Sequence, residues 1–183
     1  MPEELLVRYC SPTLAGIKTG NLFSCFCESV DKMREVVRDW NKLLRGKGLR
    51  ILPLNYKNNR ALIYVYRPGK LKNDLEDNRA ERILSERGYF CDNCRNCISH
   101  LRKRMTESEE FPHEIGLFLG YPPEDVCGFI ENKAECCKCV GCWKVYGDEE
   151  GAKKTFEKYK KCTEEYCNLF ANGRSIERLT VAV

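Results

Sequence analysis

Two short cysteine runs contain the residues best suited to chemistry. The first run is Cys91-Asp-Asn-Cys94-Arg-Asn-Cys97, and the second is Cys136-Cys137-Lys-Cys139-Val-Gly-Cys142. With three cysteines in the first run and four in the second, they contain seven of the 13 cysteines in the chain. Cysteines two residues apart allow one short loop to present several thiolates to a single metal ion or cluster. The spacing therefore predicts a zinc ion or an iron–sulfur cluster.

The first run favours an iron–sulfur cluster if it forms a loop. His100 follows Cys97 at the same interval, so potential ligands recur at every third residue. In a regular helix each such step turns the ligand by about 60° around the axis, so only a loop or a 3₁₀ turn lets all of them face one ion. The bacterial ferredoxin pattern has a further cysteine and a proline just afterwards, and this sequence has neither, so another ligand must come from elsewhere.

Joint coordination by both runs is the interpretation we favour. Cys139-Val-Gly-Cys142 has a glycine in its turn and could complete a four-cysteine zinc site with Cys91 and Cys94. The candidate metal ligands are Cys91, Cys94, Cys97, Cys136, Cys139 and Cys142. The alternative is that these residues are free thiols in loops, because spacing motifs also arise by chance.

The composition predicts one cytoplasmic domain. The chain has 183 residues, of which 43% are hydrophobic and 32% charged, enough for one core and too few for two ordinary domains, so we expect residues 1–183 to form a single domain. The amino terminus is acidic where a signal peptide is basic, and no apolar stretch approaches the roughly 18 residues of a membrane span. A reducing cytoplasm keeps thiols free, which favours metal or redox chemistry over a disulfide framework.

Charge does not identify a partner. The net charge of +4 is small and dispersed along the chain, which argues against nucleic-acid binding. The helix expected to begin at Pro122-Pro123 would also present Glu124, Asp125 and Glu131 to phosphates, which would repel them. A metal or redox function would instead imply a redox or metal-handling protein as partner.

The hydrophobic pattern predicts an α+β fold with a small mixed sheet of three to four strands. Residues 22–27 alternate as in a strand, with Cys25 and Cys27 as core thiols. Ser29 can cap an amphipathic helix that ends before Gly46. The following strands would form a sheet covered by helices, and the later two-thirds of the chain reads as mostly helical.

Further elements follow from local signals. Residues 50–56 and 60–66 predict two strands joined by a turn at 57–59, and Pro53 places the first of them at a sheet edge. A charged helix is expected over residues 71–87.

The clearest helix lies in the last third of the chain. Asp148 can cap it, Cys162 packs on its inner face, and Asn172-Gly173 ends it. Residues 176–183 are apolar and β-branched, which predicts a terminal strand.

One long segment resembles a known family. Phe111-Pro-His-Glu-Ile-Gly-Leu-Phe-Leu-Gly-Tyr-Pro-Pro-Glu-Asp-Val126 is similar to the signature of the bacterial family named domain of unknown function 3793. Cys10-Ser-Pro-Thr-Leu-Ala-Gly-Ile-Lys18, Trp143-Lys-Val-Tyr-Gly-Asp148 and Ser175-Ile-Glu-Arg-Leu-Thr180 extend the resemblance over nearly the whole chain. The resemblance implies a small stand-alone protein of an anaerobic bacterium, without an assigned activity. The first cysteine run lies outside these segments, so a site there would be specific to this chain or a subgroup.

A small enzyme is the first alternative function. His113 beside Glu114 suits general acid–base chemistry, although capping or packing is the simpler interpretation. Cys10 and Lys18 bring together a nucleophile and a cation that would lower the pKa of the thiol, while Ser11-Pro12-Thr13 suits a turn. An enzyme would form its pocket from these two segments. The second alternative is a non-catalytic adaptor with an exposed apolar patch.

Overall fold

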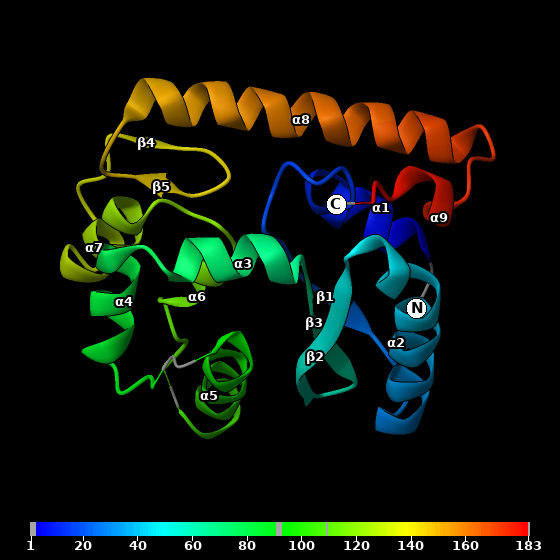
Figure 1. The fold of residues 1–183 in the computed structure, drawn as a ribbon, viewed down its shortest axis with the longest axis horizontal. Coiled ribbons are helices and arrows are strands. Elements are labelled where there is room, and N and C mark those ends of the chain that lie inside the picture. The colour runs from blue at the N-terminus through cyan, green and yellow to red at the C-terminus, as the bar shows by residue number, and fades with distance from the viewer. Residues whose placement is uncertain (1–2, 91–92, 109, 183) are drawn as a thin grey trace. The chain divides into compact units, whose positions relative to one another are not determined.

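The computed structural model describes residues 3–90, 93–108 and 110–182. These residues divide into two compact units (Figure 1). Among them, no helix combines the length and the apolar character that crossing a membrane requires.

The two units share one long helix. Unit 1 contains the described residues up to Lys70 and from Lys161 onward, and unit 2 contains Leu71–Lys160. Helix α8, Glu149–Ala171, therefore supplies residues to both. The single domain expected from the chain length stays a prediction.

Unit 1 is built on a three-stranded sheet with the strand order β1-β3-β2. Its elements are α1 (Glu3–Leu14), β1 (Gly20–Phe26), α2 (Val30–Leu44), the 3₁₀ turn Arg45–Lys47, β2 (Arg50–Lys57), β3 (Arg60–Tyr66) and α9 (Ile176–Leu179). Both strand pairs are antiparallel. The predicted α+β class is confirmed, with a purely antiparallel sheet in place of a mixed one.

Helix α2 forms as its sequence predicts. The Ser29 side chain accepts a hydrogen bond from the Lys32 backbone N–H at 3.1 Å, the expected N-terminal cap. Its apolar stripe is buried and consists of Met33, Val37, Trp40 and Leu44. The chain then turns at Gly48 with a φ of 75°, a left-handed conformation that glycine adopts without steric cost.

The β2–β3 hairpin is also confirmed. Its two turn residues, Asn58 and Asn59, have φ angles of 52° and 56°, which asparagine tolerates better than most residues and which match the strand twist. Pro53 lies on β2, an edge strand, where its missing N–H costs no sheet hydrogen bond.

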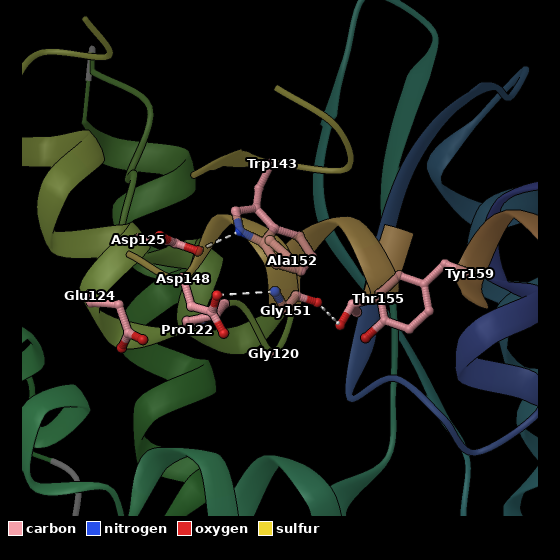
Figure 2. Close-up of a pocket in the computed structure, with 10 residues that line it drawn as sticks. All are labelled: Gly120, Pro122, Glu124, Asp125, Trp143, Asp148, Gly151, Ala152, Thr155 and Tyr159. Atoms are coloured by element: carbon pink, nitrogen blue, oxygen red, sulfur yellow. Dashed lines mark hydrogen bonds between the residues drawn. The ribbon is translucent and has the colours of Figure 1, made fainter. Parts of the chain in front are cut away.

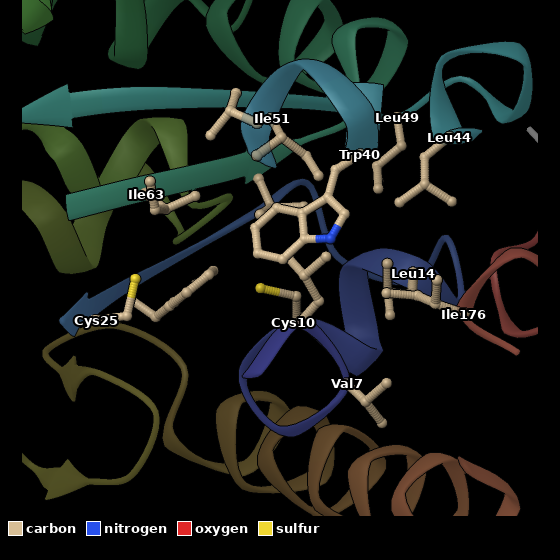
Figure 3. Close-up of a cluster of buried hydrophobic side chains, with 14 of the residues drawn as sticks. Val7, Cys10, Leu14, Cys25, Trp40, Leu44, Leu49, Ile51, Ile63 and Ile176 are labelled. Carbon is tan, nitrogen blue, oxygen red and sulfur yellow. The ribbon is translucent and has the colours of Figure 1, made fainter. Parts of the chain in front are cut away.

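The core of unit 1 contains several thiols as well as aliphatic side chains (Figure 3). Cys10, Cys25 and Cys27 are 0%, 5% and 4% exposed. Cys25 and Cys27 are thus core thiols, as predicted from the alternation of β1. Trp40 lies in the same cluster, with Cys10 beside it (Figure 3).

Two predictions at the chain ends are wrong. Ser11-Pro12-Thr13 belongs to the last turn of α1, because the helix continues to Leu14 and every residue from Cys10 to Leu14 is buried. Residues 176–179 form the short helix α9, where Ser175 accepts a hydrogen bond from the Arg178 N–H. A short apolar segment does not by itself distinguish a buried helix from a strand.

Unit 2 is mostly helical. Its elements are α3 (Pro68–Leu75, from Leu71 onward), α4 (Asn78–Ser85), α5 (Cys94–Glu107), α6 (Ile115–Phe118), α7 (Pro123–Glu131), β4 (Cys139–Val140), β5 (Lys144–Val145) and the first part of α8. Helix α7 begins at Pro123 as predicted and packs on α4, α6 and β5. The single helix expected over residues 71–87 is wrong, since Asp77 accepts hydrogen bonds from Arg79 and Ala80 and starts a new helix.

One buried guanidinium joins distant segments of unit 1. Arg67 is 2% exposed. Its Nε donates to the Thr13 carbonyl at 2.6 Å, and one Nη donates to Leu14 at 2.6 Å and Val181 at 2.8 Å. The other Nη reaches the Lys47 carbonyl at 3.1 Å. Burial lowers the pKa of Arg67, and the four carbonyls compensate for its lost hydration.

We expect Arg67→Met to lower the free energy of unfolding by about 3–5 kcal/mol, because the carbonyl acceptors would remain buried without a donor. Urea denaturation followed by circular dichroism measures the change. Arg34→Met is the control, because the Arg34 side chain is 69% exposed; its effect should stay within about 0.5 kcal/mol. Equal losses in both variants would contradict the assignment.

Candidate functional site

The second cysteine run begins just before a small hairpin in unit 2 and continues into its first strand and turn. Strands β4 and β5 pair antiparallel, with Cys139 opposite Val145. None of the four cysteines of the run is disulfide-bonded; Cys136 and Cys142 are exposed, and Cys137 and Cys139 are partly buried. The run therefore presents several accessible thiols within seven residues.

A buried carboxylate on α7 anchors this hairpin. Asp125 is 3% exposed. One oxygen accepts from the Tyr146 and Gly147 backbone N–H groups at 2.7 and 2.8 Å, and the other accepts from Trp143 Nε1 at 2.7 Å. All three donors are uncharged, and together they fix the loop that follows the second run onto α7.

Aromatic packing holds the hairpin turn. The Trp143 ring stacks on Tyr121 at 4.8 Å between centroids and meets Phe156 edge-on at 4.5 Å. A Cβ on Gly141 would lie only 2.2 Å from the Phe156 ring, so no larger residue fits there. The Tyr121 hydroxyl donates to the Cys142 carbonyl at 3.2 Å, and burial raises the pKa of this tyrosine to about 12.

The backbone before the hairpin is conformationally unusual. Lys133, Ala134 and Cys136 have φ angles of 50°, 66° and 56°, a region that non-glycine residues seldom adopt and that costs about 1–2 kcal/mol each. Tertiary contacts hold this segment, since the Ala134 N–H donates to Phe129 at 2.9 Å and Lys144 Nζ donates to the Ala134 carbonyl at 2.6 Å. Such strain is concentrated at functional sites in many proteins.

A buried tyrosine hydroxyl lies near the run. The Tyr146 oxygen is buried, and no hydrogen bond to it is found among the residues that the structure describes. Its ring is fixed against Gly128, where a Cβ would lie 2.5 Å from the ring. Burial raises the pKa of Tyr146, and the neighbouring Cys137 and Cys136 raise it further. This hydroxyl is a donor available to a thiolate.

The first cysteine run is described only in part. Cys91 and Asp92 lie outside the described residues. From Cys94 the chain is helical, capped by Asn93, whose side chain accepts from the Asn96 N–H at 3.0 Å. The expectation of a loop is thus wrong from Cys94 onward, because the asparagine cap starts a helix.

Cys97 and the nearby His100 do not form a shared site with described ligands. Cys97 is 1% exposed and disulfide-bonded, so its sulfur offers no thiolate in this state. The His100 ring stacks on Tyr89 with 4.2 Å between centroids. Over the described residues, no three His, Cys, Asp or Glu side chains are grouped so as to hold a metal ion. Shared coordination by the two runs stays a prediction.

His113 and Glu114 have separate structural roles in unit 2. Glu114 is 2% exposed, and its carboxylate pairs with Arg104 Nε at 2.7 Å and accepts from the Tyr89 hydroxyl at 2.9 Å. Burial, and then the Glu114 charge, raises the pKa of Tyr89. His113 is exposed, and its ring meets Phe129 edge-on at 5.0 Å. These contacts favour ion pairing for Glu114 and aromatic packing for His113 over a shared role in acid–base catalysis.

Cys10 and Lys18 belong to unit 1. Both are buried, at 0% and 5% exposure. Burial raises the pKa of the Cys10 thiol far more than the Lys18 charge lowers it. The expectation that the lysine activates this thiol is wrong, because desolvation of the thiolate outweighs the charge.

A pocket of about 260 Å³ adjoins the hairpin (Figure 2). Its lining residues are Gly120, Pro122, Glu124, Asp125, Trp143, Asp148, Gly151, Ala152, Thr155 and Tyr159. None was a predicted site residue. Asp148 had a visible signal as a helix cap, and its carboxylate indeed accepts from the Gly151 N–H at 3.1 Å. The other lining residues carry no such local signal, because only the tertiary fold brings them together around the pocket.

Comparison with known proteins gives a family and no near relative. A family model described as protein of unknown function (DUF3793) matches residues 6–180, which confirms the resemblance. No curated protein and no solved structure matches the chain. The matched span includes both cysteine runs, Asp125 and the whole pocket lining.

Asp125→Asn is expected to lower the free energy of unfolding by about 1–3 kcal/mol. The asparagine NH₂ group would point at either the Trp143 N–H or the two backbone N–H groups, and two donors cannot form a hydrogen bond. The Trp143 indole N–H should exchange faster with solvent, as measured by NMR. Glu124→Gln on the neighbouring, exposed side chain is the matched control and should leave that exchange unchanged. An unchanged indole signal in Asp125→Asn would refute the anchoring role.

Native alkylation should rank the thiols by burial. With reductant removed, N-ethylmaleimide is expected to modify Cys136 and Cys142 at least about 100-fold faster than Cys10, because the buried thiol reacts only after the fold opens. Peptide mass spectrometry at successive times measures this order. Comparable rates for Cys10 and Cys142 would show that unit 1 does not protect its core thiols.

Proposed function

The chain belongs to the DUF3793 family of proteins of unknown function, and we propose that this member binds a zinc ion or an iron–sulfur cluster through its second cysteine run. The observation that carries the proposal is that four cysteines, at positions 136, 137, 139 and 142, form no disulfide and lie in or just before a hairpin fixed by Asp125. Thiolates are the preferred ligands of both centres.

A fixed backbone favours binding here. The aromatic contacts of Trp143 and the hydrogen bonds of Asp125 restrain the hairpin before any ligand arrives. A backbone that is already restrained loses less conformational entropy on binding a ligand than a flexible loop does. Coordination by the second run alone would use four thiolates, a full tetrahedral set for zinc.

The Tyr146 hydroxyl supports the same proposal. A buried donor without a partner is unfavourable unless some state of the protein supplies an acceptor. A thiolate of Cys136 or Cys137 is such an acceptor, and hydrogen bonds to ligating groups stabilise metal centres.

The first run would join the site in a second form of the proposal. Cys94 is a partly buried free thiol, and Cys91 and Cys94 together with Cys139 and Cys142 would also make four ligands. Cys97 would contribute only after reduction of its disulfide.

The identity of the centre determines the role. Zinc would staple the hairpin to its surroundings, whereas an iron–sulfur cluster would serve electron transfer, sensing or cluster delivery. Either role places the protein in cytoplasmic redox or metal homeostasis, where reduced thiols persist, with a redox or metal-handling protein as partner.

Anaerobic purification with reductant, followed by elemental analysis, tests the proposal. We expect about one zinc ion per chain, or iron and sulfide with a brown colour, because thiolate-bound clusters absorb visible light and zinc does not. The variant with Cys139→Ser and Cys142→Ser should lose the metal. The matched control, Cys162→Ser with Cys167→Ser, changes two partly buried thiols of α8 and should retain it.

Cys94→Ser separates the two forms of the proposal. Retention of metal in this variant would assign the site to the second run alone, whereas loss would support joint coordination. Stoichiometric metal in neither the parent protein nor any variant would overturn the proposal.

A further inference from the structure

The pocket geometry points to a second binding site, for a small organic cation carrying an alkylammonium group. The site lies within unit 2 between the loop after α6, the start of α7, the hairpin and the first turns of α8. It does not depend on the metal proposal, because none of the cysteines that the structure describes lines the pocket.

The charge of the lining selects a cation. Among the described residues that line it, the ionisable side chains other than Tyr159 are Glu124, Asp125 and Asp148, and none is basic. Arg79 pairs with Glu124 at 3.1 Å, which offsets one charge of the three. The three hydrogen-bond donors to Asp125 are uncharged, so none of them offsets a carboxylate charge. The positive end of α8 does not reverse this balance, since a helix terminus is equivalent to only about half a charge.

The form of the pocket disfavours a chelated metal ion. A divalent ion such as Ca²⁺ or Mg²⁺ needs several convergent oxygen ligands. Of the three carboxylates here, Glu124 is paired with Arg79, and Asp148 accepts the Gly151 N–H. Asp125 in particular already accepts three hydrogen bonds.

Aromatic walls favour an organic cation over a hydrated one. Trp143 and Tyr159 both line the pocket, and aromatic rings attract alkylammonium groups while gaining apolar contact. Figure 2 shows Glu124 and Asp148 on one side of the pocket, with Thr155 and Tyr159 on the other. At about 260 Å³ the space is smaller than the roughly 300–1,000 Å³ of drug-sized sites, so the ligand must be small.

Asp148 is the residue that would receive the ammonium group. It is exposed, with one oxygen accepting the Gly151 N–H. A Cβ on Gly151 would lie 2.4 Å from the other oxygen. Only glycine at this position therefore allows the Asp148 carboxylate to lie where it does beside the pocket.

Isothermal titration of the reduced protein with 1,4-diaminobutane tests the inference, with 1,4-butanediol as the neutral analogue and MgCl₂ as the inorganic cation, all at one ionic strength. We expect saturable binding of the diamine alone. Asp148→Asn should weaken binding at least about tenfold through loss of a charge-assisted hydrogen bond. Asparagine caps a helix as well as aspartate does, so this variant should fold.

Glu150→Gln is the matched control, because Glu150 is exposed on the same turn and does not line the pocket. It removes the same charge and should change binding by less than about twofold. Absence of diamine binding, equal binding of the diol, displacement by Mg²⁺ at equal concentration, or equal weakening by Glu150→Gln would each overturn the inference.

Discussion

The Asp125 carboxylate is the interaction on which the second unit's candidate sites depend. A buried carboxylate without partners would cost several kcal/mol, and here the loop from Trp143 to Gly147 satisfies it with three neutral donors. The carboxylate and the loop thus require each other. The thiol run precedes this loop and the pocket is lined by both Asp125 and Trp143, so a single residue of α7 positions both features.

Buried charges with uncharged partners recur in this protein. Arg67 joins four carbonyls in unit 1 much as Asp125 joins three N–H groups in unit 2. Glu114 differs, because it pairs with the Arg104 guanidinium. One rigid side chain that hydrogen-bonds to several backbone segments holds those segments in place although they have little regular structure of their own. Hydrophobic contact alone fixes such segments less specifically.

Local chemistry made much of the fold predictable. Ser29 caps its helix, Asn58 and Asn59 form the hairpin turn, and α8 ends just before Gly173, because each signal acts within a few residues. The break at Asp77 was missed because an aspartate inside a helical pattern can either continue the helix or cap a new one. Helix α9 was missed because a short apolar segment can form either a strand or a buried helix. Cysteine spacing identified the thiol run, but neither the hydrogen bonds of Asp125 nor the pocket, because both arise from residues far apart in sequence.

Ligand binding at the two proposed sites would be coupled through one side chain. Trp143 follows Cys142 directly and forms a wall of the pocket, while its indole N–H is bound to Asp125. A metal ion on Cys142 and a cation against Trp143 would therefore act on the same short, tightly packed segment. If either ligand shifts that segment, the effect on the other must be equal in free energy, because coupling between two binding equilibria is reciprocal. The anchoring by Asp125 limits how far it can shift, and so limits the size of the coupling.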